Sequence, residues 1–401
     1  MKKLKIAIFS SMLSGAGGGA PRSAAVQAGA LADSGADVTV FTGYSRKYPL
    51  TPEAFPLGRA KVVASKSWGP AALGLNVGSF LSFYRQCRSF DIVHVNMGWN
   101  LNTFIASRIA RHFGVPYIYS LRSHMGEYHF RRFRFLKPVL FDLFEKRNIR
   151  DAFAVHVTAD WESETSARAI GDQRIIKIPN AMDPSDFSDP VPREKARLEL
   201  GLSSDAFHVV CLGRLGAQKN PEFLVRSFHE ANLTEQTFLH FVGPPERRVK
   251  QKLLALIKDL ELQGRVNFVD YVSGYKRRCW LSCADVFALP SHDENFCIAL
   301  IEAVAAGTYG LITPHVGAIE YLPSGMLRVE PLELDRWSTA FRELALKPPP
   351  QTLCTKNLGE LFSPRRIAQQ WLDVYTSMGL PKHSQKVGEC GDNGIHNQRN
   401  A

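Results

Sequence analysis

Short apolar segments alternate with segments of helical spacing along most of the 401 residues, and this alternation limits the possible folds more than any other feature. The apolar segments have the length of strands buried on both faces. They are residues 5–9, 38–41, 92–95, 117–119 and 154–157 and, after a break, 209–212, 238–242, 266–268 and 286–289. Repeated strand–helix units predict an α/β protein with two doubly wound, Rossmann-like domains that face each other across a cleft.

A turn-rich segment separates the two series. Residues 179–192 read PNAMDPSDFSDPVP, a composition typical of a domain junction. We therefore expect a first domain over residues 1–182 and a second over 183–362. Residues 363–379 predict a terminal amphipathic helix, and the polar, aperiodic residues 380–401 predict a disordered tail.

Composition excludes several other classes. No apolar run approaches the ~18–20 residues of a membrane helix, and the apolar start at 6–9 is shorter than a signal-peptide core of about 7–15 residues. Seven scattered cysteines without a CxxC pair argue against a disulfide framework or a zinc site. These features predict a cytoplasmic protein.

The net charge of +11 is concentrated in one half of the chain. Residues 1–180 hold 24 Lys and Arg against 12 Asp and Glu, whereas the remainder is close to neutral. An anionic membrane, an anionic acceptor or a nucleic acid would each suit such a domain.

A glycine loop, GAGGGA at residues 15–20, follows the first predicted strand. A dinucleotide site would need an acidic residue at the end of the second strand, and 38–43 (VTVFTG) has none, which disfavours a dehydrogenase. The loop is either a tight strand-to-helix turn or a place where bare amides approach a donor phosphate or an acceptor. Gly17, Gly18 and Gly19 are the candidates for that contact.

Cations follow the first strand of the second domain, in CLGRLGAQKN at residues 211–220. Gly213 permits close backbone approach, and Arg214 and Lys219 can neutralise a nucleoside diphosphate leaving group. The alternative, a metal held by a D-x-D pair, is disfavoured because the sequence contains no such pair. A solvated basic turn remains an open interpretation of this segment.

Two carboxylates lie in the segment 290–307, PSHDENFCIALIEAVAAG. Glu294 and Glu302 are eight positions apart, a little over two turns of 3.6 residues, so both can face the same side. Glu302 lies in an otherwise apolar helix, where an unpaired carboxylate would be costly, and ribose hydroxyls are suitable donors. Glu294 precedes the helix, where backbone amides also point at ligands.

Together these motifs resemble the large group 1 (family 4) of glycosyltransferases, which have the two-domain GT-B fold. The resemblance rests on GRLxxxKN followed by PSxxENF with E-x7-E, about 75 residues later. IPNAMD at 178–183 and DIVHV at 91–95 are weaker echoes, and the terminal helix resembles one that crosses back to the first domain.

The resemblance implies a retaining transfer without a bound metal or cofactor. It implies contacts of Arg214 and Lys219 with the diphosphate, of Glu302 with the ribose and of Glu294 with the transferred sugar. The donor site would also include Asn295, Phe296, Cys297 and Ile298, mostly through backbone amides. Val316 and Gly317 lie near the next donor loop.

The sequence departs from the family pattern at three places. Cys297 replaces a glycine common after ENF, and Ala181 replaces the glycine of PNGVD. In the first-domain loop SLRSHMG (120–126), strict alignment makes Arg122 the residue that faces the sugar, whereas the His-Met-Gly order favours His124. Both stay candidates for a catalytic role beside Glu294.

The acceptor side has fewer signals. Residues 122–150 hold eight Lys or Arg against three Asp or Glu and interleave them with phenylalanines, which suits an interfacial membrane segment, a single-strand nucleic-acid surface or a solvated basic helix. We favour peripheral docking at the inner face of the cell membrane. Trp99 is a candidate for stacking on an acceptor sugar, and a buried tryptophan is the alternative.

The sequence therefore predicts a transferase that moves a hexose from a UDP- or GDP-sugar to a glycan or lipid-linked acceptor in the synthesis of cell-surface polysaccharide or lipopolysaccharide. Three alternatives remain: a nucleotide-sugar epimerase of the same fold, a basic nucleic-acid-binding protein, and an inactive homologue. We expect no nucleic-acid partner and no cofactor, because the nucleotide-sugar is itself a substrate.

Overall fold

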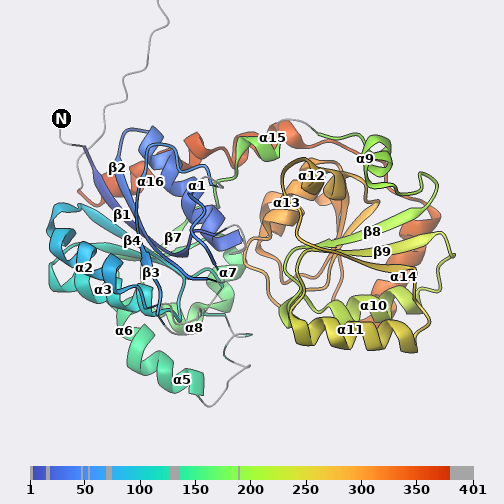
Figure 1. Cartoon of the computed structure of the whole chain (residues 1–401), viewed down its shortest axis with the longest axis horizontal. Helices are drawn as coiled ribbons and strands as arrows, with labels where there is room; N and C mark the ends of the chain where they lie inside the picture. Colours follow the sequence, from blue (N-terminus) through green and yellow to red (C-terminus); the bar gives the residue numbers. More distant parts are fainter. Residues whose placement is uncertain are drawn as a thin grey trace, which may run out of the picture.

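The computed structural model describes residues 3–14, 19–46, 48–52, 55–68, 75–123, 125–126, 128, 130, 136–187 and 190–379. Two parallel sheets, each flanked by helices on both faces, form two domains that lie side by side (Figure 1). The predicted α/β architecture is therefore confirmed. The expected disorder at 380–401 concerns residues outside these ranges.

The first sheet has seven parallel strands in the order β3-β2-β1-β4-β5-β6-β7. Its strands are β1 (Lys5–Met12), β2 (Asp37–Tyr44), β3 (Lys61–Lys66), β4 (Ile92–Asn96), β5 (Tyr117–Ser120), β6 (Ala154–Val157) and β7 (Ile175–Lys177). The helices are α1 (Gly19–Asp33), α2 (Val77–Gln86), α3 (Leu101–His112), α5 (Leu136–Leu140), α6 (Lys146–Arg150), α7 (Asp160–Thr165) and α8 (Ala167–Ile170), with the 3-10 turn η3 (Cys87–Ser89) and the π-helical η4 (Phe141–Glu145).

The second sheet has six parallel strands in the order β10-β9-β8-β11-β12-β13. Its strands are β8 (Phe207–Leu212), β9 (Thr237–Val242), β10 (Val266–Val269), β11 (Val286–Leu289), β12 (Tyr309–Ile312) and β13 (Leu327–Val329). The helices are α9 (Arg193–Leu200), α10 (Pro221–Glu230), α11 (Arg247–Asp259), α12 (Gly274–Ser282), α13 (Ile298–Ala305), α14 (Leu334–Leu346), α15 (Thr355–Leu361) and α16 (Pro364–Ser377), with the 3-10 turns η5 (Pro184–Asp186), η6 (Ala217–Lys219), η7 (Gly317–Tyr321) and η8 (Ser324–Met326).

The strand order reverses between β1 and β4 in one sheet and between β8 and β11 in the other. Loops at such reversals diverge and leave a crevice at the carboxyl ends of the strands, where ligands of open α/β sheets bind. In this chain the loops after β4, β5, β8 and β11 carry Trp99, Arg122, Lys219 and Glu294.

All nine predicted strands are present, and four strands were missed: β3, β7, β12 and β13. β3, with sequence KVVASK, lies at a sheet edge and is only half-buried, so it lacks a strong apolar run. β7 and β13 have three residues each, too few to show a period.

The last helix, α16, leaves the second domain and packs against α1 of the first (Figure 1). Trp371 and Tyr375 of α16 are buried in the same apolar core as Ile6 of β1 and Leu31 of α1. The chain therefore crosses between the domains twice, once at η5 and once at α15.

Candidate functional site

Unusual backbone conformations gather where the two domains meet. Of the residues other than glycine in the described ranges, eight have a positive φ, and six of them lie in loops after β4, β5, β8 or β11. They are Met97, Trp99, Arg122, Ser123, Asn220 and Cys297. Such conformations cost of order 1–3 kcal/mol each and cluster at functional sites, which locates the candidate site at this boundary.

The loop after β8 brings its backbone close to that of the next loop. Gly213 has a φ of 134°, and a Cβ at this position would lie 3.2 Å from Cε of Lys219. A Cβ at Gly243, after β9, would lie 2.4 Å from the carbonyl oxygen of Gly213. Both positions therefore require glycine.

The two predicted cations of this loop differ in their surroundings. Arg214 is exposed, and its guanidinium has no ion pair or hydrogen bond within the part of the chain that the structure describes. The Nζ of Lys219 lies 3.2 Å from Oε2 of Glu294, which also accepts a 3.3 Å hydrogen bond from Ser291. Burial disfavours the charged form of Lys219, but the carboxylate of Glu294 outweighs this effect and raises the pKa of the ammonium. The structure thus brings together two residues that are 75 positions apart.

The loop after β11 leads into α13 through a left-handed residue. Cys297 has a φ of 51°, which explains why a glycine suits this position in related sequences. Burial raises the pKa of its thiol to about 12, so it is protonated near neutral pH. The amides of Phe296, Cys297 and Ile298 donate to no acceptor among the described residues, as expected for a helix N-terminus that faces a ligand.

The side chain of Phe296 has a different role from its amide. It is buried and packs against Tyr321 and Phe362, with ring centroids 5.7 and 5.5 Å away. Phe362 precedes α16, so this aromatic cluster joins the loop to the returning chain. Only the backbone of Phe296 is available to a ligand.

Glu302 is buried in α13, as its apolar neighbours predict, but it is not unpaired. Its Oε2 accepts hydrogen bonds from Nε of Arg277, at 2.9 Å, and from Nη2 of the same guanidinium. Its Oε1 is buried and has no hydrogen-bond partner. One carboxylate oxygen is thus free to accept from a ligand hydroxyl.

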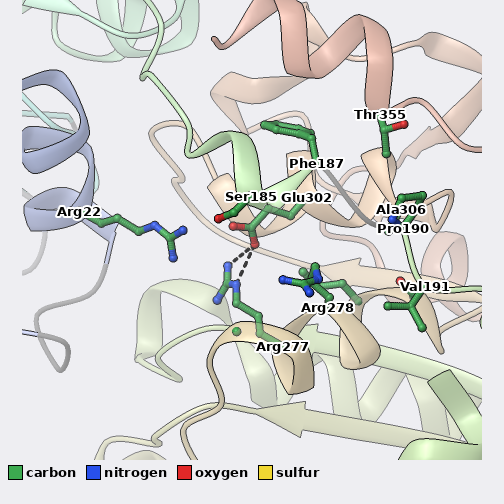
Figure 2. A pocket seen from close by; sticks show the side chains of 13 residues that line it. Arg22, Ser185, Phe187, Pro190, Val191, Arg277, Arg278, Glu302, Ala306 and Thr355 are labelled. Atoms are coloured by element: carbon green, nitrogen blue, oxygen red, sulfur yellow. Dashed lines mark hydrogen bonds and ion pairs between the residues drawn. The ribbon is translucent and has the colours of Figure 1, made fainter. Parts of the chain in front are cut away.

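A pocket of about 600 Å³, part of it open solvent, lies against Glu302. Figure 2 shows that Arg22 of α1 extends across the domain boundary toward Arg277 and Glu302. Arg278 completes a set of three guanidinium groups around the carboxylate. The pocket therefore suits a ligand that has both anionic groups and hydroxyls.

Sequence reasoning missed the arginines of this pocket. Arg277 and Arg278 belong to the segment SGYKRRCW at 273–280, which follows the strand β10 just as Arg214 follows β8. Basic residues directly after a predicted strand could therefore have indicated this part of the site in the sequence. Arg22, two residues after the glycine loop, was not singled out in the sequence.

The glycine loop itself lies mostly outside the described ranges. Gly17 and Gly18 are not described, whereas Gly19 begins α1. A Cβ at Gly19 would lie 3.8 Å from Cδ1 of Ile298. This end of the loop therefore adjoins the N-terminus of α13 across the domain boundary.

Of the two candidates in the first-domain loop, only Arg122 is described; His124 lies outside the described ranges. Arg122 is buried and donates hydrogen bonds to the side chains of Asn96, at 3.1 Å, and Asn180. Burial lowers the pKa of its guanidinium to about 10, which leaves the group charged at neutral pH. Arg122 therefore joins the ends of β4 and β5 to the junction segment.

Trp99, the predicted acceptor residue, is half-buried among aromatic and basic groups. Its ring contacts Phe130 edge-on and the tilted ring of Phe141, and Nζ of Lys137 lies 5.2 Å from the ring centroid. Its amide donates to the buried carboxylate of Glu145 at 2.8 Å. This packing fixes the ring next to the basic helices α5 and α6.

Among the described residues, no group of three or more His, Cys, Asp or Glu side chains is arranged so that it could hold a metal ion. No helix in the described ranges is both long enough and apolar enough to cross a bilayer. Independence from a metal stays a prediction.

Two family models match the chain, one in each domain. Residues 18–181 match the model described as a glycosyl transferase 4-like domain. Residues 192–357 match the model described as glycosyl transferases group 1. The two matches meet at the predicted junction.

The chain is also similar in sequence to individual glycosyltransferases and in fold to solved structures. A D-inositol 3-phosphate glycosyltransferase of Actinosynnema mirum is 28% identical over 218 residues, 51% of this chain and 52% of the relative. The chain thus spans about half the length of that relative. Sucrose-phosphate synthase of Thermosynechococcus elongatus superposes with a TM-score of 0.75 at 20% identity, over 94% of this chain and 99% of the other. HepE of Anabaena, solved with UDP and glucose, gives 0.70 at 16% identity over 93% and 100%.

Proposed function

This chain belongs to the group 1 glycosyl transferases and has the GT-B fold, and from this premise we propose that it transfers a hexose from a UDP- or GDP-sugar with retention of configuration. The observation that carries the proposal is the half-satisfied carboxylate of Glu302 at the wall of a pocket lined by guanidinium groups. A buried acceptor with one empty oxygen matches a ribose hydroxyl, and the cations match a diphosphate. HepE, which shares the fold, was solved with UDP and glucose.

The proposed reaction breaks the bond between the anomeric carbon and the diphosphate oxygen, and the electron pair leaves with the nucleoside diphosphate. The anomeric carbon forms its new bond to a hydroxyl oxygen of the acceptor, and the proton of that hydroxyl passes to the departing diphosphate. Lys219, Arg214 and the free amides at the start of α13 stabilise that charge, which replaces the role a metal would have. Glu294 is held beside Lys219 and accepts from the hydroxyls of the transferred sugar. Arg122 or His124 faces the sugar from the first domain.

Nucleotide binding tests this proposal directly. We expect UDP or GDP to raise the melting temperature of the protein, and Arg214→Ala and Glu302→Ala to weaken binding in isothermal calorimetry by roughly tenfold or more each. Arg226→Ala is the matched control, because Arg226 is an exposed arginine of α10 outside the pocket. Unchanged nucleotide affinity in both site variants would overturn the assignment. Conversion of the sugar without any acceptor would favour an epimerase.

For the acceptor side we propose peripheral contact with an anionic membrane at its cytoplasmic face, where a lipid-linked glycan acceptor would be held. α5 and η4 project from the lower edge of the first domain (Figure 1) and expose Val139, Leu143 and Phe144 by 55%, 62% and 42%. Basic side chains accompany these residues: Lys137, Lys146, Arg147 and Arg150. Exposed apolar groups among cations are typical of segments that insert at the surface of anionic bilayers.

Vesicle co-sedimentation checks the membrane contact. We expect the protein to sediment with vesicles that contain an anionic phospholipid, weakly with neutral ones, and less after Leu143→Ser with Phe144→Ser. Leu346→Ser is the control, since this side chain is 86% exposed but lies in the second domain. Equal loss in the control, or binding to an oligonucleotide in place of vesicles, contradicts the assignment of this surface.

A further inference from the structure

α7 of the first domain lies at the boundary and faces the second domain (Figure 1). Its contacts with the second domain include η7 and the short loop that carries Glu294. The residues before and after Glu294 in the sequence, Asp293 and Asn295, each hydrogen-bond a group of the first domain.

Before Glu294, Nε1 of Trp161 donates to Oδ1 of Asp293 at 3.1 Å. The indole ring also stacks on His315, with centroids 5.1 Å apart. His315 in turn accepts a 2.8 Å hydrogen bond from the amide of Glu294 through its backbone carbonyl. Trp161 therefore contacts two residues that flank or hydrogen-bond Glu294, namely Asp293 and His315.

After Glu294, a buried carboxylate of α7 accepts from the loop. Hydrogen-bond complementarity orients the amide nitrogen of Asn295 toward Glu162, 2.8 Å from Oε2, and toward Oγ1 of Thr158 at 2.7 Å. Glu162 is fully buried, and its Oε1 accepts from the amide of Ser123 at 2.7 Å. One side chain thus links the loop of Arg122 to the loop of Glu294.

The loop of Glu294 is also held by contacts within the second domain. The amide of Gly317 donates to the carbonyl of Glu294 at 3.0 Å, and a Cβ at Gly317 would lie 1.9 Å from the carbonyl oxygen of Asn295. Burial raises the pKa of Asp293 to about 6. Contacts from both domains therefore determine where the carboxylate of Glu294 lies.

We propose that α7 is the element that positions Glu294 for transfer, with Trp161 and Glu162 as positioning residues that act from the other domain. The inference rests on the proposed function of Glu294 at the transferred sugar. Its consequence is that Trp161 and Glu162 contribute to transfer and not to nucleotide binding, because the sugar-facing carboxylate reaches its working position only when α7 is docked.

The experiment compares Trp161→Phe and Glu162→Gln with Tyr321→Phe in the full-length protein. Tyr321→Phe is the matched control: it also removes a hydrogen bond between the domains, from Tyr321 to the carbonyl of Thr158 at 2.9 Å, but not one that flanks Glu294. Trp161→Phe removes the N–H donor and reduces the indole to a single aromatic ring that can still pack on His315, so folding should be preserved, as a melting curve verifies.

Three readouts separate positioning from binding. We expect the Kd for UDP or GDP to stay within about twofold of wild type, because the nucleotide contacts are untouched. The kcat for breakdown of UDP-glucose or GDP-mannose should fall roughly 10- to 100-fold with little change in KM, the size expected for a misplaced group. Hydrogen exchange of the amides of 293–298 should become faster in both variants and not in Tyr321→Phe.

The outcomes discriminate between the two proposals. A wild-type protein that binds neither nucleotide overturns the proposed function and this inference with it. Intact nucleotide binding with unchanged kcat and unchanged exchange in Trp161→Phe and Glu162→Gln overturns the positioning role alone. An equal loss in Tyr321→Phe would also overturn it, since general weakening of the domain contact would then explain the effect.

Discussion

Cys297 occupies a backbone conformation that the amino acids around it do not reveal. Its φ of 51° lies in the left-handed region, which costs a residue with a Cβ roughly 1–2 kcal/mol. From the sequence it was only a departure from a glycine-containing pattern. The structure supplies the reason: the loop from β11 turns into α13 at this residue, and the amides that follow are thereby directed at the candidate site.

The effect of a substitution at Cys297 on stability should therefore depend on how well the new residue tolerates a left-handed backbone conformation. We expect Cys297→Gly to change the free energy of unfolding by no more than about 1 kcal/mol. Glycine relieves the left-handed strain, which stabilises the fold, but it also removes a buried side chain and gives the unfolded chain more conformational freedom, and these effects nearly cancel. Cys297→Val should destabilise by about 2 kcal/mol or more, since β-branched residues tolerate this region least. Urea unfolding measures both. The control is Cys279→Val in the regular helix α12; an equal loss there would contradict a backbone cause.

A pair of buried imidazoles makes the second domain sensitive to acid. Nδ1 of His208 lies 3.0 Å from Nε2 of His240, and Nε2 of His208 lies 2.9 Å from the carbonyl oxygen of Ser203. Burial, with a further contribution from His208, lowers the pKa of His240 from 6.5 to about 3. The folded protein therefore holds this ring neutral where the unfolded chain would protonate it.

The sign of the pH dependence follows from that depressed pKa. The stability associated with neutral His240 is fully present above pH 6.5 and is lost as the pH falls toward 3, by about 1.4 kcal/mol per pH unit. His240→Gln, which keeps an N–H donor, should therefore flatten the fall in urea-unfolding stability between pH 6 and pH 4. His229→Gln, at an exposed position of α10, serves as the control. Parallel curves for wild type and His240→Gln would contradict this explanation.

At the scale of elements, α16 attaches the end of the described chain to the first domain through polar as well as apolar contacts. The hydroxyl of Tyr375 shares a 2.6 Å hydrogen bond with Nε2 of His94, which is fully buried on β4. Trp371 packs edge-on against both His94 and His156, with centroids 4.7 and 4.8 Å away. Removal of one partner leaves a buried nitrogen without a hydrogen bond.

Tyr375→Phe tests this attachment. We expect a loss of about 1–3 kcal/mol, because the ring remains but Nε2 of His94 is left unpaired in a site without solvent. Thermal unfolding monitored by circular dichroism should show the shift. Tyr271→Phe, at a side chain that is 60% exposed, should have no measurable effect. A similar shift in both variants would mean that the hydroxyl of Tyr375 contributes nothing specific.

Sequence patterns predicted the sheets but not the contacts between elements. The alternation of apolar and helical segments sufficed for nine strands, because buried parallel strands are nearly continuous apolar runs. The burial of Glu302 was predicted correctly, because the residues around it in α13 are apolar and the helix is therefore expected to be buried. The pairing of Glu302 with Arg277 was not predicted, because the packing of α12 beside α13 depends on the tertiary fold and leaves no periodic pattern in the sequence. The role of α7 escaped prediction for the same reason.

At the scale of the whole molecule, the pocket is built from both domains. Glu302, Arg277 and Arg278 come from the second domain, whereas Arg22 comes from the first. Figure 2 shows the guanidinium of Arg22 directed across the boundary toward the pair formed by Arg277 and Glu302. A ligand that fills this space would therefore contact both domains at once, and its binding would favour their present arrangement.

A first-domain substitution should accordingly weaken nucleotide binding by the second domain. We expect Arg22→Ala to raise the Kd for UDP or GDP by about five- to tenfold, the range of one charge-assisted hydrogen bond, and this effect should shrink as salt screens the cation. Arg22→Lys should recover part of the affinity, because the charge remains while the planar fork is lost. Arg46→Ala, an exposed arginine of the same domain outside the pocket, controls for net charge. If calorimetry gave the same Kd for wild type and Arg22→Ala, the donor site would be confined to the second domain, and α7 would remain the route by which the first domain contributes to transfer.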